Sequence, residues 1–303
     1  MRRVGILVGW DENNPVAKLL LSKSTQRLQE LGWTEGSNIQ LDVRWGAGNV
    51  DRMRVFANEL VGLGPDLIVA STTPATAALN RETRTVPIVF ATASDPVGAG
   101  LVASLSRPGA NITGFINLES TMGGKWLEFL KEVAPSLKRV AIMFNPDTAP
   151  GGGSYFLPSF EAAAQSLHVT PIVAPVHDET GIEETVTMLG SQPGGGLVVM
   201  SDGFMVVHRA KIISLLIEHK VPAISDQTLS TERGGLLTYG PALEELFLGA
   251  ALYADRILRG AKPAELPVQV PTKFEVRLNL KTAEILGLTI PPSIIARADG
   301  VIE

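Results

Sequence analysis

Short runs of β-branched and other apolar residues alternate with longer amphipathic segments along the whole chain. The apolar runs have the length and composition of buried strands, whereas the longer segments have the periodicity of helices. The predicted strands are residues 4–8, 39–44, 66–70, 88–91, 112–115, 139–144, 169–173, 196–200, 223–225 and 236–239. The predicted helices are residues 15–31, 50–63, 74–84, 96–106, 121–133, 156–167, 179–189, 205–218 and 242–259. Because strands that are apolar on both faces belong to parallel sheets covered by helices on each side, the pattern predicts an α/β fold.

The alternation of strands and helices starts afresh in the middle of the chain. The strand at 112–115 is followed by NLES (117–120) and a new helix, and a second strand–helix series begins at Arg139. Ten parallel strands are near the limit of one open sheet, so two lobes are the easier arrangement, and 303 residues agree with about two domains. Residues 260–267 are expected to cross between the lobes. Residues 271–279 are expected to be extended, and the end to form a short helix at 282–286 and a stiff tail.

The composition excludes several classes of function. Apolar residues make up 45% of the chain and charged residues 19%, which supplies a core and excludes intrinsic disorder. A formal net charge of −5 offers no basic field to nucleic acid, so no nucleic-acid partner is expected. The absence of cysteine excludes disulfides, thiolate metal sites and cysteine nucleophiles. The start, MRRVGILVG, reads as a strand rather than a signal peptide, and any export signal is expected to have been removed or never to have existed.

Small polar residues follow four of the predicted strands, in STTP (71–74), TASDP (92–96), SDG (201–203) and TYGP (238–241). Each alone is explained as a helix N-cap followed by proline or a new helix. In open parallel sheets, however, the carboxyl ends of the strands border the binding crevice, and helix N-termini there attract anions. The predicted ligand contacts at these ends are Ser71, Thr72, Thr73, Thr92 and Ser94 in the first lobe, and Ser201, Asp202 and Asp226 in the second. Hydroxyl donors on one side and carboxylates on the other suit a zwitterion such as an amino acid.

Two aromatic residues lie at strand ends, where they are placed to meet a ligand. Trp10 follows the first strand and is predicted either to cover an apolar ligand side chain or to pack against the following helix. Tyr239 precedes Gly240 and Pro241 and offers a ring and a hydroxyl to the same crevice. The other tryptophans, Trp33, Trp45 and Trp126, are predicted to pack in the interior.

Catalytic and cofactor motifs are absent or lack their structural context. The chain has no GxSxG elbow and no GxxxxGK[ST] phosphate loop, and no catalytic residues are predicted. GAGLVA (98–103) fits a loose dinucleotide pattern, but it does not follow a strand as that fingerprint requires. The four histidines lack the spacing of a helical metal pair, so neither a metal nor another cofactor is expected. PGGG (150–153) is predicted to be a mobile loop.

Several longer motifs resemble a known family. They are LGWTEGSNI (31–39), VPIVF (86–90), SDPVGAGLV (94–102), RPGANITG (107–114), PTKFE (271–275), NLKTA (279–283) and GLTIPPS (287–293). Together they resemble ABC transporter substrate-binding proteins of the tryptophan/tyrosine-uptake type, and the resemblance runs from Val4 to the end of the chain. The resemblance implies a type I periplasmic-binding-protein fold, with two doubly wound lobes joined by three crossing segments and a hinge. The lobes would comprise residues 1–116 plus 242–268 and residues 117–241 plus 269–303, with a ligand cleft between them.

The resemblance also implies a ligand site at the strand ends. In the first lobe it supports Ser71, Thr72, Thr73, Thr92, Ser94, Asp95 and Asn117, and in the second Asn145, Ser201, Asp202, Asp226 and Tyr239. The stretches 10–13, 149–155 and 224–227 depart from the family pattern and are expected to set ligand choice.

Three hypotheses of function follow. The first is a non-enzymatic receptor, periplasmic or otherwise extracytoplasmic, that captures a small carboxylate and delivers it to the membrane permease of an ABC importer. The ligand would be an aromatic or branched amino acid or an aromatic acid. The alternatives are an α/β enzyme acting on a small metabolite, for which Ser201 and Asp202 are a thin candidate pair, and the ligand-sensing domain of a regulator.

Overall fold

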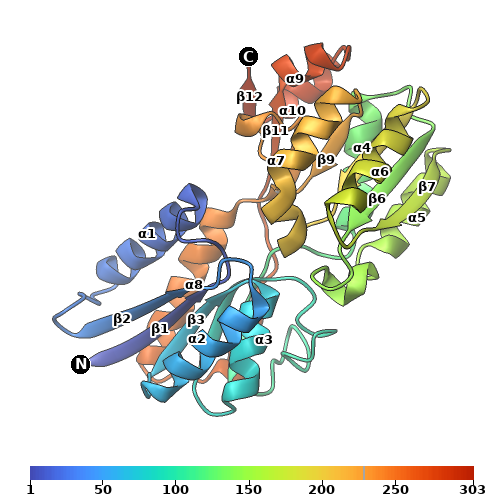
Figure 1. Ribbon diagram of the computed structural model, residues 1–303. Coiled ribbons are helices and arrows are strands. Elements are labelled where there is room, and N and C mark those ends of the chain that lie inside the picture. The colour runs from blue at the N-terminus through green and yellow to red at the C-terminus, as the bar shows by residue number, and fades with distance from the viewer. Residues whose placement is uncertain (228) are drawn as a thin grey trace. The chain divides into compact units, whose positions relative to one another are not determined.

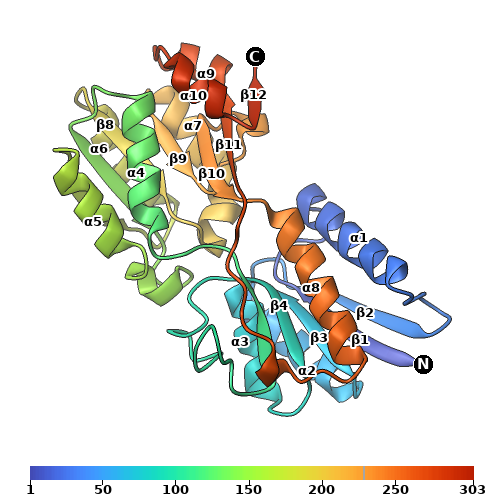
Figure 2. The ribbon, with the colours of Figure 1, turned by 180° about the vertical axis from the view of Figure 1, so that it is seen from behind.

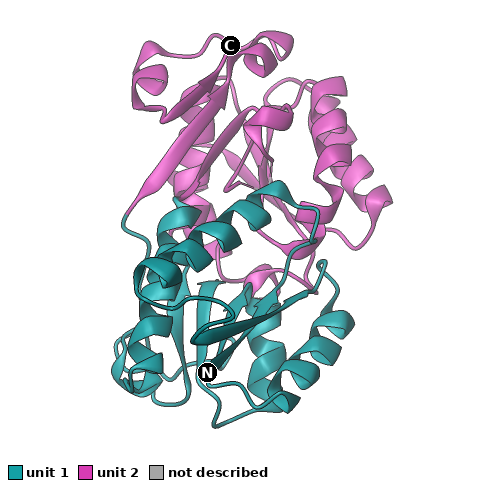
Figure 3. Ribbon diagram, turned by 90° about the vertical axis from the view of Figure 1, so that its left-hand side faces the viewer, with its two compact units in different colours: residues 1–119, 242–272 teal, residues 120–241, 273–303 magenta. Residues whose placement is uncertain are grey.

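The computed structural model describes residues 1–227 and 229–303 (Figure 1). The chain forms two compact units, residues 1–119 with 242–272 and residues 120–241 with 273–303 (Figure 3). The backbone therefore passes from one unit to the other three times, after Glu119, Pro241 and Thr272. Each unit has its own sheet and its own helices.

Unit 1 contains a parallel five-stranded sheet in the order β2-β1-β3-β4-β5. The strands are β1 (Arg2–Val8), β2 (Ile39–Trp45), β3 (Leu67–Ser71), β4 (Ile88–Ala93) and β5 (Ile112–Ile116). Its helices are α1 (Pro15–Glu30), α2 (Val50–Gly62), α3 (Thr73–Glu82) and α8 (Leu243–Leu258). Figure 2 shows α8 lying across the sheet beside α1. The strand order reverses between β1 and β3, and such a switch point is where ligands bind in this class of sheet.

Burial on both faces explains why the strands of unit 1 are apolar throughout. Successive side chains of a strand point to opposite faces. Along β1, Val4, Ile6 and Val8 join the core beneath α1 and α8. Leu7 joins the second core, formed with Met53 and other residues of α2 and α3.

Unit 2 contains a seven-stranded sheet in the order β12-β11-β10-β9-β8-β6-β7. The strands are β6 (Arg139–Phe144), β7 (Thr170–Pro175), β8 (Gly195–Val199), β9 (Ala223–Ser225), β10 (Leu237–Pro241), β11 (Phe274–Asn279) and β12 (Gly300–Ile302). The helices are α4 (Met122–Val133), α5 (Leu157–Ser166), α6 (Glu179–Gly190), α7 (Gly203–Glu218), α9 (Leu280–Ile285) and α10 (Pro292–Arg297). The parallel part, β7-β6-β8-β9-β10, repeats the order of unit 1, so its switch point lies between β6 and β8. Only the β10–β11 pair is antiparallel among the strand pairs of the described residues.

All ten predicted strands are present, but the predicted helix at 96–106 is wrong. Residues 94–111 contain no helix or strand. The backbone is left-handed at Asp95 (φ 46°) and Gly100 (φ 66°), which a helix does not allow. Two further elements were not predicted: the stiff tail contains α10 and β12.

The PGGG segment, which the sequence predicts to be a mobile loop, forms a turn, and its mobility stays a prediction. Pro150–Gly153 forms a 3₁₀ turn with left-handed glycines. Gly153 packs so closely on the Phe144 ring that an added Cβ would lie 2.1 Å from Phe144 Cε2.

No helix among residues 1–227 and 229–303 combines the length and the apolar character needed to cross a membrane.

Candidate functional site

The carboxyl edge of the unit 1 sheet gathers polar side chains from three adjacent strands. Ser71 Oγ, at the end of β3, accepts a hydrogen bond from the Gly9 amide after β1 (3.1 Å). Thr92 Oγ1, in β4, accepts one from the Thr72 amide (3.1 Å). The predicted unit 1 residues Ser71, Thr72, Thr73, Thr92, Ser94, Asp95 and Asn117 therefore lie along one edge.

Hydrogen bonds continue from β3 across β4 to the end of β5. Thr73 Oγ1 accepts from the Ser94 amide (3.0 Å) and donates to the Ser94 carbonyl (3.1 Å). The Ser94 hydroxyl donates to Asn117 Oδ1 (2.8 Å). These side chains hold the edge of unit 1 in one arrangement without a ligand.

Thr72 is the most unusual residue of this edge. Its backbone has φ 78° and ψ 149°, a conformation that β-branched residues avoid, and such strain costs about 1–3 kcal/mol. Among the described residues, its buried Oγ1 has no hydrogen-bond partner. An unsatisfied buried hydroxyl costs a further ~1–3 kcal/mol, which a polar ligand atom at this point would recover.

Thr72 is also the N-cap of α3, and its side chain makes no capping hydrogen bond. The first-turn amides of α3 therefore lack a side-chain acceptor at the strand-end edge. A helix N-terminus in this position attracts a carboxylate or another anion.

Gly9 permits the close approach of β1 to Thr72. A Cβ at Gly9 would lie 2.2 Å from Thr72 Oγ1 and 2.9 Å from the Ser71 carbonyl oxygen. The sequence reasoning missed Gly9, because nothing local distinguishes a glycine at the end of a strand from any other.

Trp10 packs on α8. The sequence analysis had named a ligand side chain or the following helix as the partner of this ring. Its ring stacks on Phe247, with centroids 6.0 Å apart and an interplanar angle of 24°. Trp10 is half-buried, and the amide of Ala47 donates to its carbonyl (3.1 Å). Phe247 is buried in the unit 1 core, so the half-buried Trp10 ring is the part of this pair that faces outward beside the β1/β3 switch point.

Asp95 shapes the loop that follows β4. Its Oδ1 accepts a hydrogen bond from the Gly98 amide (2.9 Å), closing a tight turn at a left-handed residue. The carboxylate therefore has a structural partner next to the predicted site.

The carboxyl edge of the unit 2 sheet holds the second group of predicted residues. Asn145 follows β6, and Ser201 and Asp202 follow β8, so they flank the second switch point. Asp226 follows β9 and lies beside Gly240, where an added Cβ would come within 3.2 Å of the Asp226 carbonyl carbon.

Both carboxylate oxygens of Asp202 are bonded within unit 2. Oδ2 accepts from the Asn145 amide (3.0 Å), and Oδ1 accepts from the Met205 amide (2.8 Å) and the Thr148 hydroxyl (3.1 Å). Burial raises the pKa of Asp202 to about 6, and these hydrogen bonds oppose that rise. The geometry gives Asp202 a structural role, as the N-cap of α7 and the link to the loop after β6. Thr148, the third member of this cluster, was not predicted.

Tyr239 lies within an aromatic stack, defined as Phe129, Tyr239 and Phe274. Its ring centroid is 4.6 Å from that of Phe129 and 5.4 Å from that of Phe274. Lys125 and Arg297 lie over the two outer rings, and burial raises the pKa of the Tyr239 phenol. The packing of the ring on α4 and β11 accounts for its position without a ligand.

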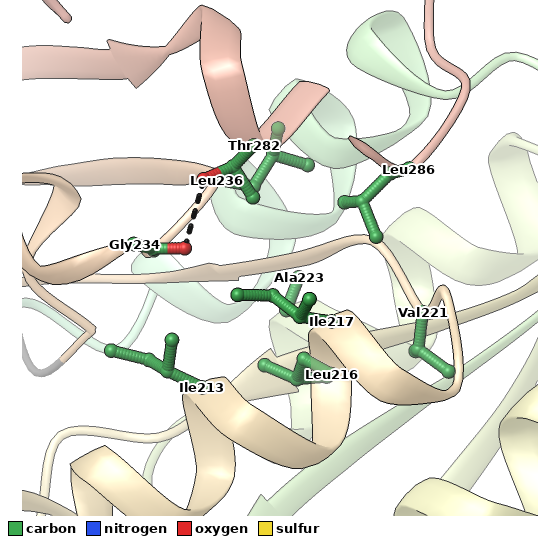
Figure 4. A pocket seen from close by; sticks show the side chains of 10 residues that line it. Ile213, Leu216, Ile217, Val221, Ala223, Gly234, Leu236, Thr282 and Leu286 are labelled. Carbon is green, nitrogen blue, oxygen red and sulfur yellow. Dashed lines mark hydrogen bonds between the residues drawn. The ribbon is translucent and has the colours of Figure 1, made fainter. Parts of the chain in front are cut away.

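A small apolar cavity in unit 2 is not a candidate ligand site. It lies between α7 and α9, is lined by Ile213, Leu216 and Leu286 among others, and has a volume of about 10 Å³ (Figure 4). The Thr282 hydroxyl donates to the Gly234 carbonyl at its wall (3.0 Å). That volume would hold at most one water molecule.

Comparisons with known proteins match nearly the whole chain. A family model described as ABC transporter substrate binding protein matches residues 21–302. A tyrosine-binding protein of Clostridioides difficile (strain R20291) is 25% identical over 264 residues, which cover 86% of this chain and 74% of that protein. The crystal structure of an ABC domain in complex with L-Trp from Streptococcus pneumoniae is 26% identical, with a TM-score of 0.89 over 99% of both chains. A conserved domain protein from Vibrio cholerae has the same identity, TM-score and coverage.

These similarities confirm the α/β fold and the family resemblance that the sequence motifs carry. The fold is that of type I periplasmic binding proteins, and the family model spans both units. The chain belongs to the family of ABC transporter substrate binding proteins.

Proposed function

We propose that this protein binds a free aromatic L-amino acid, of the tryptophan or tyrosine class, and delivers it to the permease of an ABC importer. Its place of action would be periplasmic or otherwise extracytoplasmic. Support comes from the family, and from two relatives that are described as a tyrosine-binding protein and as a complex with L-Trp.

The observation that carries the proposal is the N-terminus of α3 at the β1/β3 switch point. It combines first-turn amides that no side chain caps with the buried, unpartnered Thr72 Oγ1. An α-carboxylate would accept hydrogen bonds from these donors and offset the desolvation of the Thr72 hydroxyl.

The remaining groups of an aromatic amino acid find matching chemistry at the two sheet edges. The Trp10 ring, backed by the buried Phe247, suits an aromatic side chain. We assign the ammonium contact to Asp226, which follows β9 at the carboxyl edge of the unit 2 sheet. Asp202 keeps its structural role, because both of its oxygens accept hydrogen bonds from within unit 2. Asn117, Asn145 and Ser201 are proposed to complete the site. The family resemblance predicts that both sheet edges contact one ligand in a cleft, and this stays a prediction.

We propose no catalysis at this site. Asp202, next to Ser201, is engaged by backbone amides and by Thr148, so it is not placed to serve as the base that a serine nucleophile needs. Chemical turnover of a captured ligand would contradict the receptor assignment.

Isothermal titration calorimetry of the purified protein tests the proposal. L-Trp or L-Tyr is expected to bind at a ratio of one per chain, whereas D-ribose is not. Binding of sugars without binding of either aromatic amino acid would overturn the proposal. Benzoate separates recognition of a carboxylate alone from recognition of the whole amino acid.

Replacing Trp10 by leucine is expected to weaken L-Trp binding by about tenfold or more, because the ligand side chain loses an aromatic surface. The matched control is Trp33→Leu, since Trp33 packs in the same unit and its indole donates to Asp255 Oδ1 (2.8 Å). Equal loss of affinity in both variants would remove Trp10 from the site.

A further inference from the structure

Two arginines of unit 2, Arg209 and Arg233, lie beside the contact between a short turn and α7. Arg209 is in the second turn of α7, and Arg233 ends the 3₁₀ turn η2 (Thr231–Arg233). Gly234, the next residue, lines the cavity of Figure 4 together with Ile213, and a Cβ at Gly234 would lie 3.3 Å from Ile213 Cγ2. Because residues i and i+4 of a helix share a face, Arg209 lies one turn from this contact, on the same side of α7.

The guanidinium of Arg209 is partly buried and close to a second positive charge. Its Nη1 donates to the Val206 carbonyl, three residues earlier in α7 (2.7 Å), so the side chain turns back toward the start of the helix. Burial and the nearby charge of Arg233 both lower the pKa of Arg209. The two guanidinium groups therefore repel each other at the junction of η2 and α7.

The carboxylate nearest in sequence does not neutralise this pair. Glu232 Oε1 accepts a hydrogen bond from Arg277 Nη1 (3.0 Å), and its Oε2 accepts one from the Ser230 hydroxyl (2.6 Å). The Ser230 hydroxyl and the Arg277 guanidinium lower the pKa of Glu232, which stays ionised and engaged with them.

Carboxylates of the neighbouring helix α6 are engaged as well. Two of them contact other cations of α7, in the pairs Glu179–His208 (3.1 Å) and Glu183–Lys211 (3.4 Å). Within residues 1–227 and 229–303, no carboxylate forms an ion pair with Arg209 or Arg233. Two guanidinium groups thus share one place without an acidic partner from the described chain.

The turn that carries Arg233 is held in place on its other side. Asn279 Nδ2 donates to the Thr231 carbonyl (2.8 Å), and the Thr282 hydroxyl donates to the Gly234 carbonyl (3.0 Å). Arg233 therefore extends from a fixed backbone, and its position relative to α7 is set before anything binds. Such preorganisation lowers the entropic cost of binding.

We propose that Arg209 and Arg233 together bind a tetrahedral dianion, such as inorganic phosphate or sulfate, at the junction of η2 and α7. Guanidinium groups present paired N–H donors that match the oxygens of such anions. A dianion would also neutralise both positive charges and so remove their repulsion. One pair of arginines on a chain of net charge −5 favours a free anion over the surface of an anionic membrane.

Thermal unfolding of the full chain in phosphate and in chloride, at equal ionic strength and about pH 7.5, tests the inference. The wild type is expected to unfold about 2 °C or more higher in ~20 mM phosphate than in chloride. Arg233→Gln is expected to lose this shift. In chloride it should unfold at or above the wild-type temperature, because the repulsion of Arg209 is gone.

Two further variants make the test specific. Arg52→Gln is the matched control, because it removes the charge of an exposed arginine on α2 whose guanidinium lies over the Phe56 ring. It is expected to keep the phosphate shift, including the general stabilisation by excluded anions that all variants share. Arg209→Lys keeps the positive charge but loses the planar donor fork, and at least half of the shift should disappear.

Four results would overturn the inference. They are an unchanged phosphate shift in Arg233→Gln, a clear loss of its stability in chloride, an equal loss of the shift in Arg52→Gln, and binding to phosphatidylglycerol vesicles by a wild type that free phosphate does not stabilise. A loss of L-Trp affinity above tenfold in Arg233→Gln would place the pair in the amino acid site instead. The phosphate measurement needs no amino acid, so it can be interpreted whether or not the proposed ligand binds.

Discussion

Replacing Asp202 by alanine is expected to lower the free energy of unfolding by about 3–5 kcal/mol. Loss of a helix N-cap costs about 1 kcal/mol, and each buried donor left without an acceptor costs a further ~1–3 kcal/mol. Asp202 caps α7 and also satisfies the Asn145 amide and the Thr148 hydroxyl. Urea unfolding, followed by circular dichroism, measures the change.

Asp178→Ala is the matched control for this prediction. Asp178 is also an aspartate N-cap, on α6, but it is exposed, and within residues 1–227 and 229–303 its side chain accepts only from the Gly181 amide. Its replacement is expected to cost only about 1 kcal/mol. If the two variants lose the same stability, the internal hydrogen bonds of Asp202 do not tie the loop after β6 to α7.

The stability difference at Asp202 is expected to depend on pH. Because burial raises its pKa from 3.8 to about 6, the folded state binds this proton more tightly than the unfolded state does. Its contribution is therefore fully present below pH ~4 and is lost as the pH rises through 6, by up to about 3 kcal/mol. The difference in the free energy of unfolding between the wild type and Asp202→Asn should accordingly shrink from pH 4.5 to pH 7.5. A difference that grows over this range would contradict the raised pKa.

Gly9→Ala is expected to abolish most ligand affinity, by about 100-fold or more, and to cost about 1–3 kcal/mol of stability. The added Cβ would lie 2.2 Å from Thr72 Oγ1 and 2.8 Å from Thr72 Cγ2, so it must displace the residue at the N-cap position of α3. Thr72 cannot easily move away, since its backbone already has φ 78°. Calorimetry with L-Trp and thermal unfolding measure the two effects.

Two further variants separate this clash from a general effect of alanine. Gly62→Ala, at the end of α2, meets no atom within 4 Å and is expected to leave binding unchanged. In the double variant Gly9→Ala with Thr72→Gly, the two clashes with the Thr72 side chain disappear and glycine accepts the positive φ, so part of the stability should return while affinity stays low. The approach of the new Cβ to the Ser71 carbonyl oxygen, at 2.9 Å, remains. If the double variant is as unstable as Gly9→Ala, then Thr72 is not the group that the methyl displaces.

Sequence patterns predicted the strands well because strands that are buried on both faces are apolar at nearly every position. They failed at 96–106, where Leu101, Val102 and Leu105 have helical spacing. Backbone turns at Asp95 and Gly100 override that spacing, and nothing in local periodicity signals them.

That the candidate residues gather at the sheet edges was predictable, but their individual contacts were less so. Strand ends of a parallel sheet necessarily meet at one edge, so this gathering followed from topology alone, and ligand binding there stays a prediction. The orientation of the Tyr239 ring depends on Phe129 and Phe274, and the structural role of the Asp202 carboxylate depends on Asn145 and Thr148. These partners are distant in the sequence, so the sequence alone does not reveal that they are in contact.

The three passages of the chain between its units determine the order in which the protein can fold during synthesis. When residues 1–119 have left the ribosome, one face of the unit 1 sheet is covered by α1 alone, because α8 and the segment up to Thr272 are translated only after 120–241. Phe115, for example, awaits Tyr253 and the close fit of Gly249. The nascent amino-terminal half therefore has no complete core, and both units finish folding late, through contacts of high sequence separation.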